Sequence, residues 1–261
     1  MQIVRFSDGT QPHFGVMEPD SSHIVQLKGD PLFNDIEPAG PIKELDQVRL
    51  LSPVIPRSKV VGVGTNYRSG EDDPRNPDPV HNPPVLFLKP NTAVIGPNDP
   101  ITIPSWAKQV VPEAELAVVI RTLAKDVPLD EVDSVIFGYT CANDVSAVLP
   151  GAAGPMADVK GFDGACPLGP WIVVDPEFDP ENVLVTGSVN GELRQSDTSA
   201  HMKIGVRELV SYVSHRFTLL PGDVIVTGTP VGTGPVQAGD VLDVAIAGLG
   251  TLTNPVARAD F

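Results

Sequence analysis

The sequence predicts an α+β fold dominated by β-structure, with a mixed sheet that is rolled or sandwiched. Proline and glycine are abundant, at 28 and 24 of the 261 residues, and both disfavour long helices. Short apolar runs alternate with turn residues along the chain, which is typical of strands joined by tight turns. Helical periodicity occurs in two segments, residues 129–136 and 206–215.

The first part of the chain, residues 1–55, is expected to form a small β-rich domain beside a main body of residues 56–261. Turn residues interrupt its apolar runs at Ser7-Asp8-Gly9 and Pro19-Asp20-Ser21. These turns separate three candidate strands, which cover residues 3–6, 13–17 and 23–27.

The main body carries the remaining strands and one clear hairpin signal. Asn190-Gly191 lies between two β runs and favours a tight two-residue turn. The segment 68–84 is rich in proline and acidic residues, so it is either a surface loop or a lid over a site. The candidate strands of the main body cover residues 60–63, 85–88, 110–120, 137–146, 171–174, 183–189, 224–227 and 241–247.

Two glutamates alternate at the start of the apolar strand 110–120. Side chains of a strand project to opposite faces with period two, so Glu113 and Glu115 share a face. Two carboxylates so close repel each other and raise each other's pKa unless a cation lies between them. A hard divalent cation with oxygen ligands satisfies that condition. The alternative is a solvated strand entrance, because exposed glutamate is common.

A third carboxylate occurs in a similar setting. Asp144 lies among small and apolar residues near the end of the strand 137–146, where an unpaired carboxylate would be costly. Three carboxylates on neighbouring strands, with water or substrate oxygens completing the shell, suit Mg²⁺ or Mn²⁺. The sequence therefore predicts a metal site formed by Glu113, Glu115 and Asp144.

Charge and composition narrow the class of function. The formal net charge is −15, and a surface this acidic repels phosphate backbones and anionic lipid. We therefore expect no nucleic-acid partner and no membrane partner, and an anionic substrate would need local cations. The N-terminal residues lack a signal-peptide pattern, and the two cysteines fit no zinc or redox motif. A cytoplasmic protein with two buried thiols is expected.

Further motifs give the chain a specific resemblance. From about residue 60 to residue 256 it resembles the fumarylacetoacetate hydrolase family, particularly its small bacterial members. The motifs that carry the resemblance are Gly64-Thr65-Asn66-Tyr67, Phe87-Leu88-Lys89-Pro90, Glu113-Ala114-Glu115-Leu116, Asn143-Asp144-Val145-Ser146, Lys160-Gly161-Phe162-Asp163, Gly169-Pro170-Trp171, Asn190-Gly191, Pro221-Gly222-Asp223 and Thr227-Gly228-Thr229-Pro230.

The resemblance implies a mixed β-roll, a homodimer, and Mg²⁺, Mn²⁺ or Ca²⁺ held by the two glutamates and the aspartate. It also implies action on small 2-oxo or β-diketo acids, whose 2-oxo group and carboxylate chelate the ion so that an enolate is stabilised. Lys160 would add positive charge beside that enolate, and Lys89 and Thr229 would bind substrate. Viewed alone, the lysines also fit exposed ammonium groups, and Thr229 fits simple turn geometry.

The chain departs from the family pattern at two places. Hydrolytic members carry a histidine and a glutamate that activate water, at positions where this chain has Gly70 and Asp73. Val148 and Gly151 stand where members tend to have an arginine and a glutamine. His81 is either a replacement base or an ordinary loop histidine.

Three function hypotheses follow. The leading one is a divalent-metal-dependent enzyme that cleaves a C–C bond of a small 2-oxo or β-diketo acid, by hydrolysis or decarboxylation, through a metal-stabilised enolate. The second is a tautomerase or isomerase of dienedioate intermediates of aromatic catabolism. The third is a metal-binding relative without catalysis. Decarboxylation needs chiefly an electron sink, which a metal and Lys160 could provide.

Overall fold

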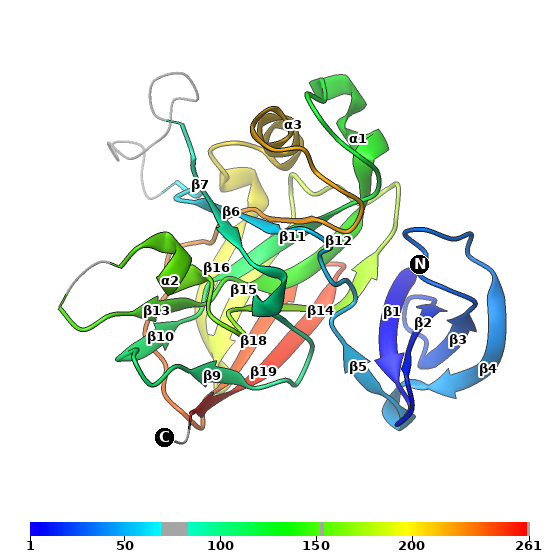
Figure 1. Ribbon diagram of the computed structural model, residues 1–261, viewed down its shortest axis with the longest axis horizontal. Helices are drawn as coiled ribbons and strands as arrows, with labels where there is room; N and C mark the ends of the chain where they lie inside the picture. The colour runs from blue at the N-terminus through cyan, green and yellow to red at the C-terminus, as the bar shows by residue number, and fades with distance from the viewer. Residues whose placement is uncertain (69–82, 152–153, 260–261) are drawn as a thin grey trace.

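The computed structural model describes residues 1–68, 83–151 and 154–259, and two packed β-sheets dominate it (Figure 1). The larger sheet has twelve strands within the described residues and contains both parallel and antiparallel pairs. Its strands follow the order β4 (Pro38–Glu44), β3 (His23–Leu27), β2 (Pro12–Met17), β1 (Gln2–Ser7), β14 (Cys166–Val173), β12 (Ile136–Asn143), β11 (Ala114–Ile120), β17 (Val224–Val226), β6 (Val60–Gly64) and β7 (Val85–Lys89), with β5 (Arg49–Leu51) paired to β1 and β8 (Val94–Ile95) paired to β14.

A smaller sheet packs against the central strands of the larger one. Leu116 and Val118 of β11 belong to the same apolar cluster as Val185 and Val244 of the smaller sheet. Residues of β11 at the alternate positions pack into a second cluster on the opposite face. The smaller sheet has the order β16 (Glu192–Thr198), β15 (Leu184–Val189), β18 (Val241–Ile246), β19 (Gly250–Arg258) and β9 (Ile101–Ile103), and β10 (Gln109–Val111) pairs separately with β13 (Ser146–Val148).

Helices are short and few among the described residues, as the proline and glycine content predicts. The expected helix 206–215 is confirmed as α3 (Val206–Arg216), whose buried residues include Leu209 and Val213. The expected helix 129–136 is shorter, because a 3₁₀ turn (Leu129–Glu131) precedes α1 (Val132–Val135) and β12 already begins at Ile136. A third helix, α2 (Met156–Lys160), had no sequence signal, and the other 3₁₀ turns are Leu45–Gln47, Asn91–Ala93 and Ser199–His201.

Two expected strands differ from their apolar pattern, one by an internal break and one by an earlier end. The expected strand 110–120 divides into β10 and β11, because Pro112 lacks the N–H needed to continue a ladder and the two parts pair with different partners. The expected strand 137–146 likewise ends at Asn143, so Asp144 lies in the connection between β12 and β13 rather than in a strand. Both breaks fall at the predicted metal ligands.

Turn residues predict the hairpin correctly, whereas a proline inside one long strand prevents its prediction. Asn190 and Gly191 both have positive φ, at 52° and 78°, and they connect β15 to β16 as expected. The strand β19 was missed because Pro255 interrupts its β pattern.

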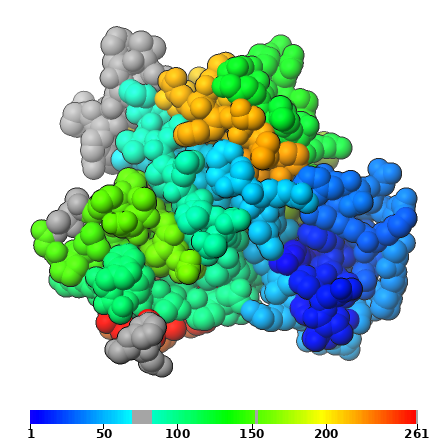
Figure 2. All heavy atoms as spheres, in the orientation of Figure 1, coloured from blue at the N-terminus to red at the C-terminus, as the bar shows by residue number. Residues whose placement is uncertain are grey.

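The N-terminal strands continue the larger sheet through the pairing of β1 with β14. Gln2 and Ile3 of β1 pair with Val173 and Ile172 of β14. In Figure 2 these first strands, in blue, lie to one side of the main body. Their expected status as a separate domain of residues 1–55 remains a prediction. No helix among the described residues is long and apolar enough to cross a membrane.

Candidate metal centre

Three carboxylates meet where β12 ends beside the start of β11. Glu113 lies between β10 and β11, Glu115 is the second residue of β11, and Asp144 follows β12 directly. The antiparallel register pairs Ala114 with Asn143, and the N–H of Asp144 donates to the C=O of Glu113 at 2.9 Å. One carboxylate oxygen of each acid lies within 4.8 Å of the other two. The structure thus brings the three predicted ligands together.

Burial makes this cluster unfavourable without added positive charge. Glu115 and Asp144 are each only 1% exposed. Burial raises the pKa of Glu115 well above its usual value, and the carboxylates of Asp144 and Glu113 raise it further. Burial also raises the pKa of Glu113, although the Lys160 ammonium opposes that rise. Neighbouring cations would keep these acids ionised.

Two buried lysines supply part of that positive charge. Lys160 Nζ donates to Glu113 Oε2 at 2.8 Å and also to Asp144 Oδ2. Lys89 Nζ, which is fully buried, donates to Asp144 Oδ1. Burial lowers the pKa of Lys160, but Asp144 and Glu113 raise it by more, so its ammonium form is retained. Three carboxylates still outnumber two ammonium groups.

Short elements place both lysines. Lys160 is the last residue of α2, and Lys89 is the last residue of β7, against which α2 packs. The Lys160 ammonium also lies 5.1 Å from the centre of the Phe87 ring. The alternative expectation, that these two lysines are exposed ammonium groups, is therefore wrong. Their roles toward a substrate remain predictions.

The donor set fits a hard divalent cation. All three predicted ligands offer carboxylate oxygens, which Mg²⁺, Mn²⁺ and Ca²⁺ prefer. Two oxygens on opposite sides of an ion, at metal–oxygen distances of about 2.1 to 2.4 Å, are about 4.2 to 4.8 Å apart. The limit of 4.8 Å between the three acids is compatible with those spans. A cation here would also remove the excess negative charge.

The turn after β17 holds one predicted ligand. The N–H of Gly228, whose φ is 101°, donates to Glu115 Oε2 at 2.7 Å. The hydroxyl of the next residue, Thr229, donates to the C=O of Ala114 at 2.9 Å and accepts from Gln195 Nε2 at 2.8 Å. Thr229 is therefore built into the wall of the site, and its predicted contact with a substrate carboxylate remains a prediction.

Three polar side chains that the sequence analysis gave no role support the acids. Ser146 Oγ donates to Glu113 Oε1 at 2.8 Å, and Asn143 Oδ1 accepts from the N–H of Glu113 at 3.0 Å. Gln195 Oε1 accepts from the N–H of Ala114 at 3.1 Å. Ser146 and Asn143 flank Asp144 in the sequence and could have been found there. Gln195, 80 positions away from Glu115, offers no local signal.

A buried tyrosine borders the acids on another side. Tyr67 has a buried hydroxyl without a hydrogen-bond partner among the described residues. Burial raises its pKa, and the charges of Glu115 and Asp197 raise it further. Gly70, Asp73 and His81, with most of the segment 68–84, lie outside the described residues.

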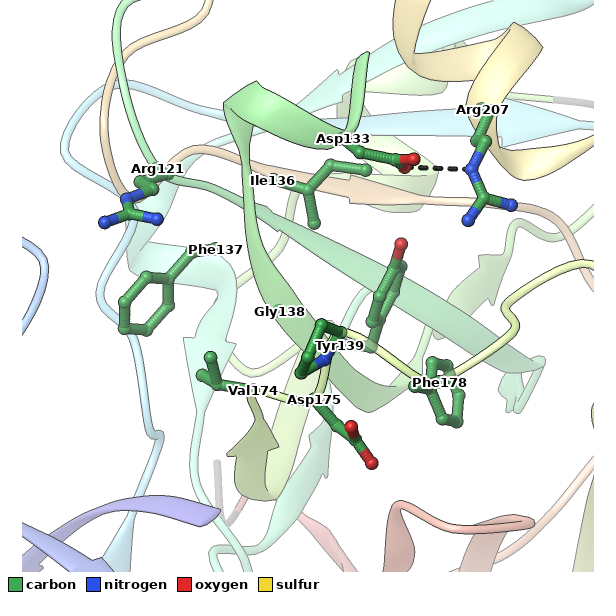
Figure 3. A pocket seen from close by; sticks show the side chains of 11 residues that line it. Arg121, Asp133, Ile136, Phe137, Gly138, Tyr139, Val174, Asp175, Phe178 and Arg207 are labelled. Carbon is green, nitrogen blue, oxygen red and sulfur yellow. Dashed lines mark hydrogen bonds and ion pairs between the residues drawn. The ribbon is translucent and has the colours of Figure 1, made fainter. Parts of the chain in front are cut away.

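A separate cavity of about 270 Å³ lies away from the acids (Figure 3). Its lining includes Tyr139, Phe178 and two arginines but none of the three carboxylates. Arg207 is ion-paired with Asp133 there, at 2.8 Å between Nε and Oδ1. The three predicted metal ligands therefore do not line this cavity.

Two family models together match most of the chain. A model described as fumarylacetoacetate (FAA) hydrolase C-terminal matches residues 59–257. A model described as Rv2993c-like, N-terminal, matches residues 1–53. The first match includes all three carboxylates and both buried lysines.

Individual proteins agree with this match. The oxaloacetate tautomerase YcgM of Escherichia coli is 41% identical over 200 residues, which cover 74% of this chain and 90% of that protein. The solved 5-carboxymethyl-2-hydroxymuconate delta-isomerase of Mycobacterium smegmatis is 39% identical, with a TM-score of 0.85 over 99% of this chain and 100% of that one. A maleylpyruvate hydrolase of Sphingobium sp. SYK-6, solved with manganese(II) and pyruvate, is 26% identical, with a TM-score of 0.81 over 100% of both chains. With its β-architecture and its three carboxylates and two lysines in one centre, this chain belongs to the fumarylacetoacetate hydrolase family.

Proposed function

We propose that this chain is a divalent-cation-dependent enzyme that cleaves a C–C bond of a small 2-oxo or β-diketo acid, with decarboxylation as the leading reaction. One observation carries the proposal: one oxygen from each of three carboxylates lies within 4.8 Å of the other two, and the Lys160 ammonium contacts two of these carboxylates. The proposed ion is Mg²⁺, with Mn²⁺ and Ca²⁺ as alternatives. Glu113, Glu115 and Asp144 are its proposed ligands.

The proposed decarboxylation depends on positive charge that is held in place at the buried metal centre. A cation bound here would polarise the substrate's 2-oxo group and carboxylate as a Lewis acid. When a 3-carboxy-2-oxo acid loses CO₂, the electron pair of the broken C–C bond passes into the 2-oxo group and gives an enolate. The Lys160 ammonium stabilises that negative charge, because a preorganised charge acts strongly where water is excluded. This step needs no activated water.

Local cations also explain how so acidic a protein would attract an anion. The net charge of −15 repels a 2-oxo acid at long range. Lys160 and Lys89 concentrate positive charge at the centre. We include Lys89 and Thr229 in the proposed substrate subsite.

Keto–enol tautomerisation is the second candidate. A relative that is 41% identical is named an oxaloacetate tautomerase, and a similar solved structure is named an isomerase. Tautomerisation also passes through an enolate of a 2-oxo acid, but it forms that enolate by breaking a C–H bond at C3 and keeps the carboxylate that decarboxylation removes. Hydrolysis has less support, because the sequence has Gly70 and Asp73 at the positions of the water-activating pair.

A substrate panel separates these reactions. Oxaloacetate, acetylpyruvate and fumarylpyruvate are each incubated with the metal-free protein, then with Mg²⁺, Mn²⁺ or Ca²⁺, and then with EDTA. Pyruvate release reports C–C cleavage, and the ultraviolet absorbance of the enol reports tautomerisation. We expect pyruvate from oxaloacetate only when a divalent cation is present.

Matched lysine variants assign the activity to the centre. Lys160→Met should reduce turnover by at least about 100-fold, a common loss when a charge-stabilising donor is removed. Lys28→Met should leave turnover unchanged, since Lys28 is exposed and pairs with Glu37. Metal binding without turnover of any substrate would instead support a non-catalytic, metal-binding relative.

The same proposal includes a homodimer, as the family resemblance implies. Sedimentation velocity over a range of protein concentrations measures the mass directly. A species of twice the 27.6 kDa chain mass is expected, and a monomer at all concentrations would contradict it.

A further inference from the structure

Both candidate reactions move a proton at C3 of the substrate. Decarboxylation must protonate the enolate after CO₂ leaves, and tautomerisation must remove a proton and return it to oxygen. The two lysines of the centre are ion-paired with the carboxylates. A separate acid–base group would exchange this proton faster than water, and an imidazole is the side chain best suited to both directions near neutral pH.

One histidine belongs to a segment joined to the wall of the centre. His201 follows β16, and its C=O accepts from the N–H of Arg68 at 3.2 Å. Two residues later, the N–H of Lys203 donates to the C=O of Asn66 at 2.7 Å. These bonds fix the loop after β16 against the chain that leaves β6.

The same chain is tied to a predicted metal ligand. Asn66 Nδ2 donates to the C=O of Thr227 at 2.8 Å. The next residue, Gly228, donates its N–H to Glu115. His201 is therefore attached through a short series of hydrogen bonds to the strand ends that hold the acids.

A carboxylate orients the imidazole. His201 Nδ1 lies 2.6 Å from Asp197 Oδ1, which directs the other ring nitrogen, Nε2, away from the aspartate. Nε2 has no hydrogen-bond partner within the described part of the chain. Asp197 lies two positions after Gln195 on β16, so both project from the same face, and Gln195 already contacts Ala114 between the two glutamates.

The other described histidines lie elsewhere in the fold. His13 and His23 belong to β2 and β3 of the N-terminal strands. His215 lies in the last turn of α3, where its Nδ1 is 2.8 Å from the C=O of Ser211. Residue 81, the fifth histidine of the sequence, is outside the described residues.

We propose that His201, oriented by Asp197, is the acid–base group that exchanges the proton at C3 of the substrate. This inference rests on the proposed function. In tautomerisation, Nε2 takes the proton from C3, the C–H electron pair forms the C2=C3 double bond, and the carbonyl π electrons move to oxygen. The imidazolium then returns the proton to that oxygen. In decarboxylation, the imidazolium protonates C3 and regains its proton from water.

The test compares two histidines of equal exposure. The side chains of His201 and His23 are both 61% exposed, and each faces a carboxylate. His201→Gln should lower kcat by about 100-fold, the lower part of the range for general acid–base catalysis, with KM and Mg²⁺ affinity unchanged. Added imidazole should restore part of the lost rate. His23→Gln should behave as the wild type, and Asp197→Asn should lower kcat without changing KM.

Chemical modification tests the position of His201 without measuring turnover. Diethyl pyrocarbonate modifies exposed imidazoles, and mass spectrometry measures the modification of each histidine. Mg²⁺ with oxalate, a 2-oxo acid analogue, should slow modification of His201 severalfold and leave His23 unchanged. Equal rates at both histidines with and without oxalate would overturn the placement.

The outcomes separate this inference from the proposed function. A wild-type protein that is inactive on every substrate refutes the proposed function and this inference with it. An active wild type whose His201→Gln variant retains kcat within about twofold refutes only the role of His201. A lost kcat that imidazole does not restore also counts against it, because a structural defect would not respond to free base.

Discussion

The substitution Glu115→Gln tests whether Glu115 is a metal ligand. The substitution keeps the shape of the side chain, and its Oε1 can still accept from the N–H of Gly228, the hydrogen bond that Glu115 makes at 2.7 Å. It removes one of the three crowded negative charges. We expect Mg²⁺ affinity to fall by about 100-fold, equivalent to about 2.7 kcal/mol.

The size of the stability effect follows from linkage. At a Mg²⁺ concentration 100 times the dissociation constant, binding stabilises the wild type by about 2.7 kcal/mol, whereas the weakened variant gains about 0.4 kcal/mol. For a chain near this length, each kcal/mol shifts Tm by about 2 to 4 °C. Mg²⁺ should thus raise Tm by about 5 to 11 °C in the wild type and by about 1 to 2 °C in the variant.

The metal-free proteins should differ in the opposite direction. Because the native-state pKa of Glu115 is raised, the native state retains a proton that the unfolded state has lost. Wild-type stability therefore falls as pH rises from the usual glutamate pKa of about 4.3 toward the raised value. The amide introduced by Glu115→Gln does not titrate, so the metal-free variant should be at least as stable as the wild type at pH 7.

Scanning calorimetry with and without Mg²⁺ measures both effects. Glu37→Gln is the matched control, because the Glu37 side chain is exposed and its ion pair with Lys28 lies at the surface. It should show the wild-type response to Mg²⁺. An equal Mg²⁺-induced shift in Glu115→Gln and the wild type would refute the ligand assignment.

Three further predictions concern the surrounding residues. Asp144→Ala should abolish Mg²⁺ uptake while circular dichroism stays native, and urea unfolding should show a loss of about 3 to 5 kcal/mol, because buried Lys89 loses its carboxylate partner and Lys160 keeps only Glu113; unchanged Mg²⁺ affinity by titration calorimetry would contradict it. Gly228→Ala should cost about 1 to 3 kcal/mol, since φ is 101° and the new Cβ would lie 2.7 Å from Asn66 Cβ, and it should weaken Mg²⁺ binding; wild-type values of both would contradict it. Gln195→Ala should lower Mg²⁺ affinity by about 10-fold through Ala114 and Thr229, as loss of a supporting hydrogen bond does at metal sites, and titration calorimetry with unchanged affinity would contradict it.

The sequence predicts those features of the protein that a few consecutive residues determine. The alternation of Glu113 and Glu115 placed two acids side by side, and the structure brings their oxygens together with Asp144. The predicted turn at Asn190-Gly191 is confirmed, because both residues tolerate positive φ. These features need only a few consecutive residues to specify them.

Tertiary contacts determined what the sequence did not reveal. Gln195 reaches the acids only because β16 folds beside them, and no local pattern marks it. The five-residue helix α2 is too short for periodicity to detect, yet it places Lys160 against two carboxylates. The sequence does not reveal the break at Pro112, because apolar residues precede it at Val110 and Val111 and resume without interruption from Leu116.

Anomalous diffraction from crystals grown with Mn²⁺ and oxalate tests the central claim most directly. The account predicts one manganese peak per chain, about 2.2 Å from an oxygen of each of Glu113, Glu115 and Asp144. A peak elsewhere, or a structure in which Lys160 and Lys89 keep every Asp144 oxygen and no ion binds, would contradict it.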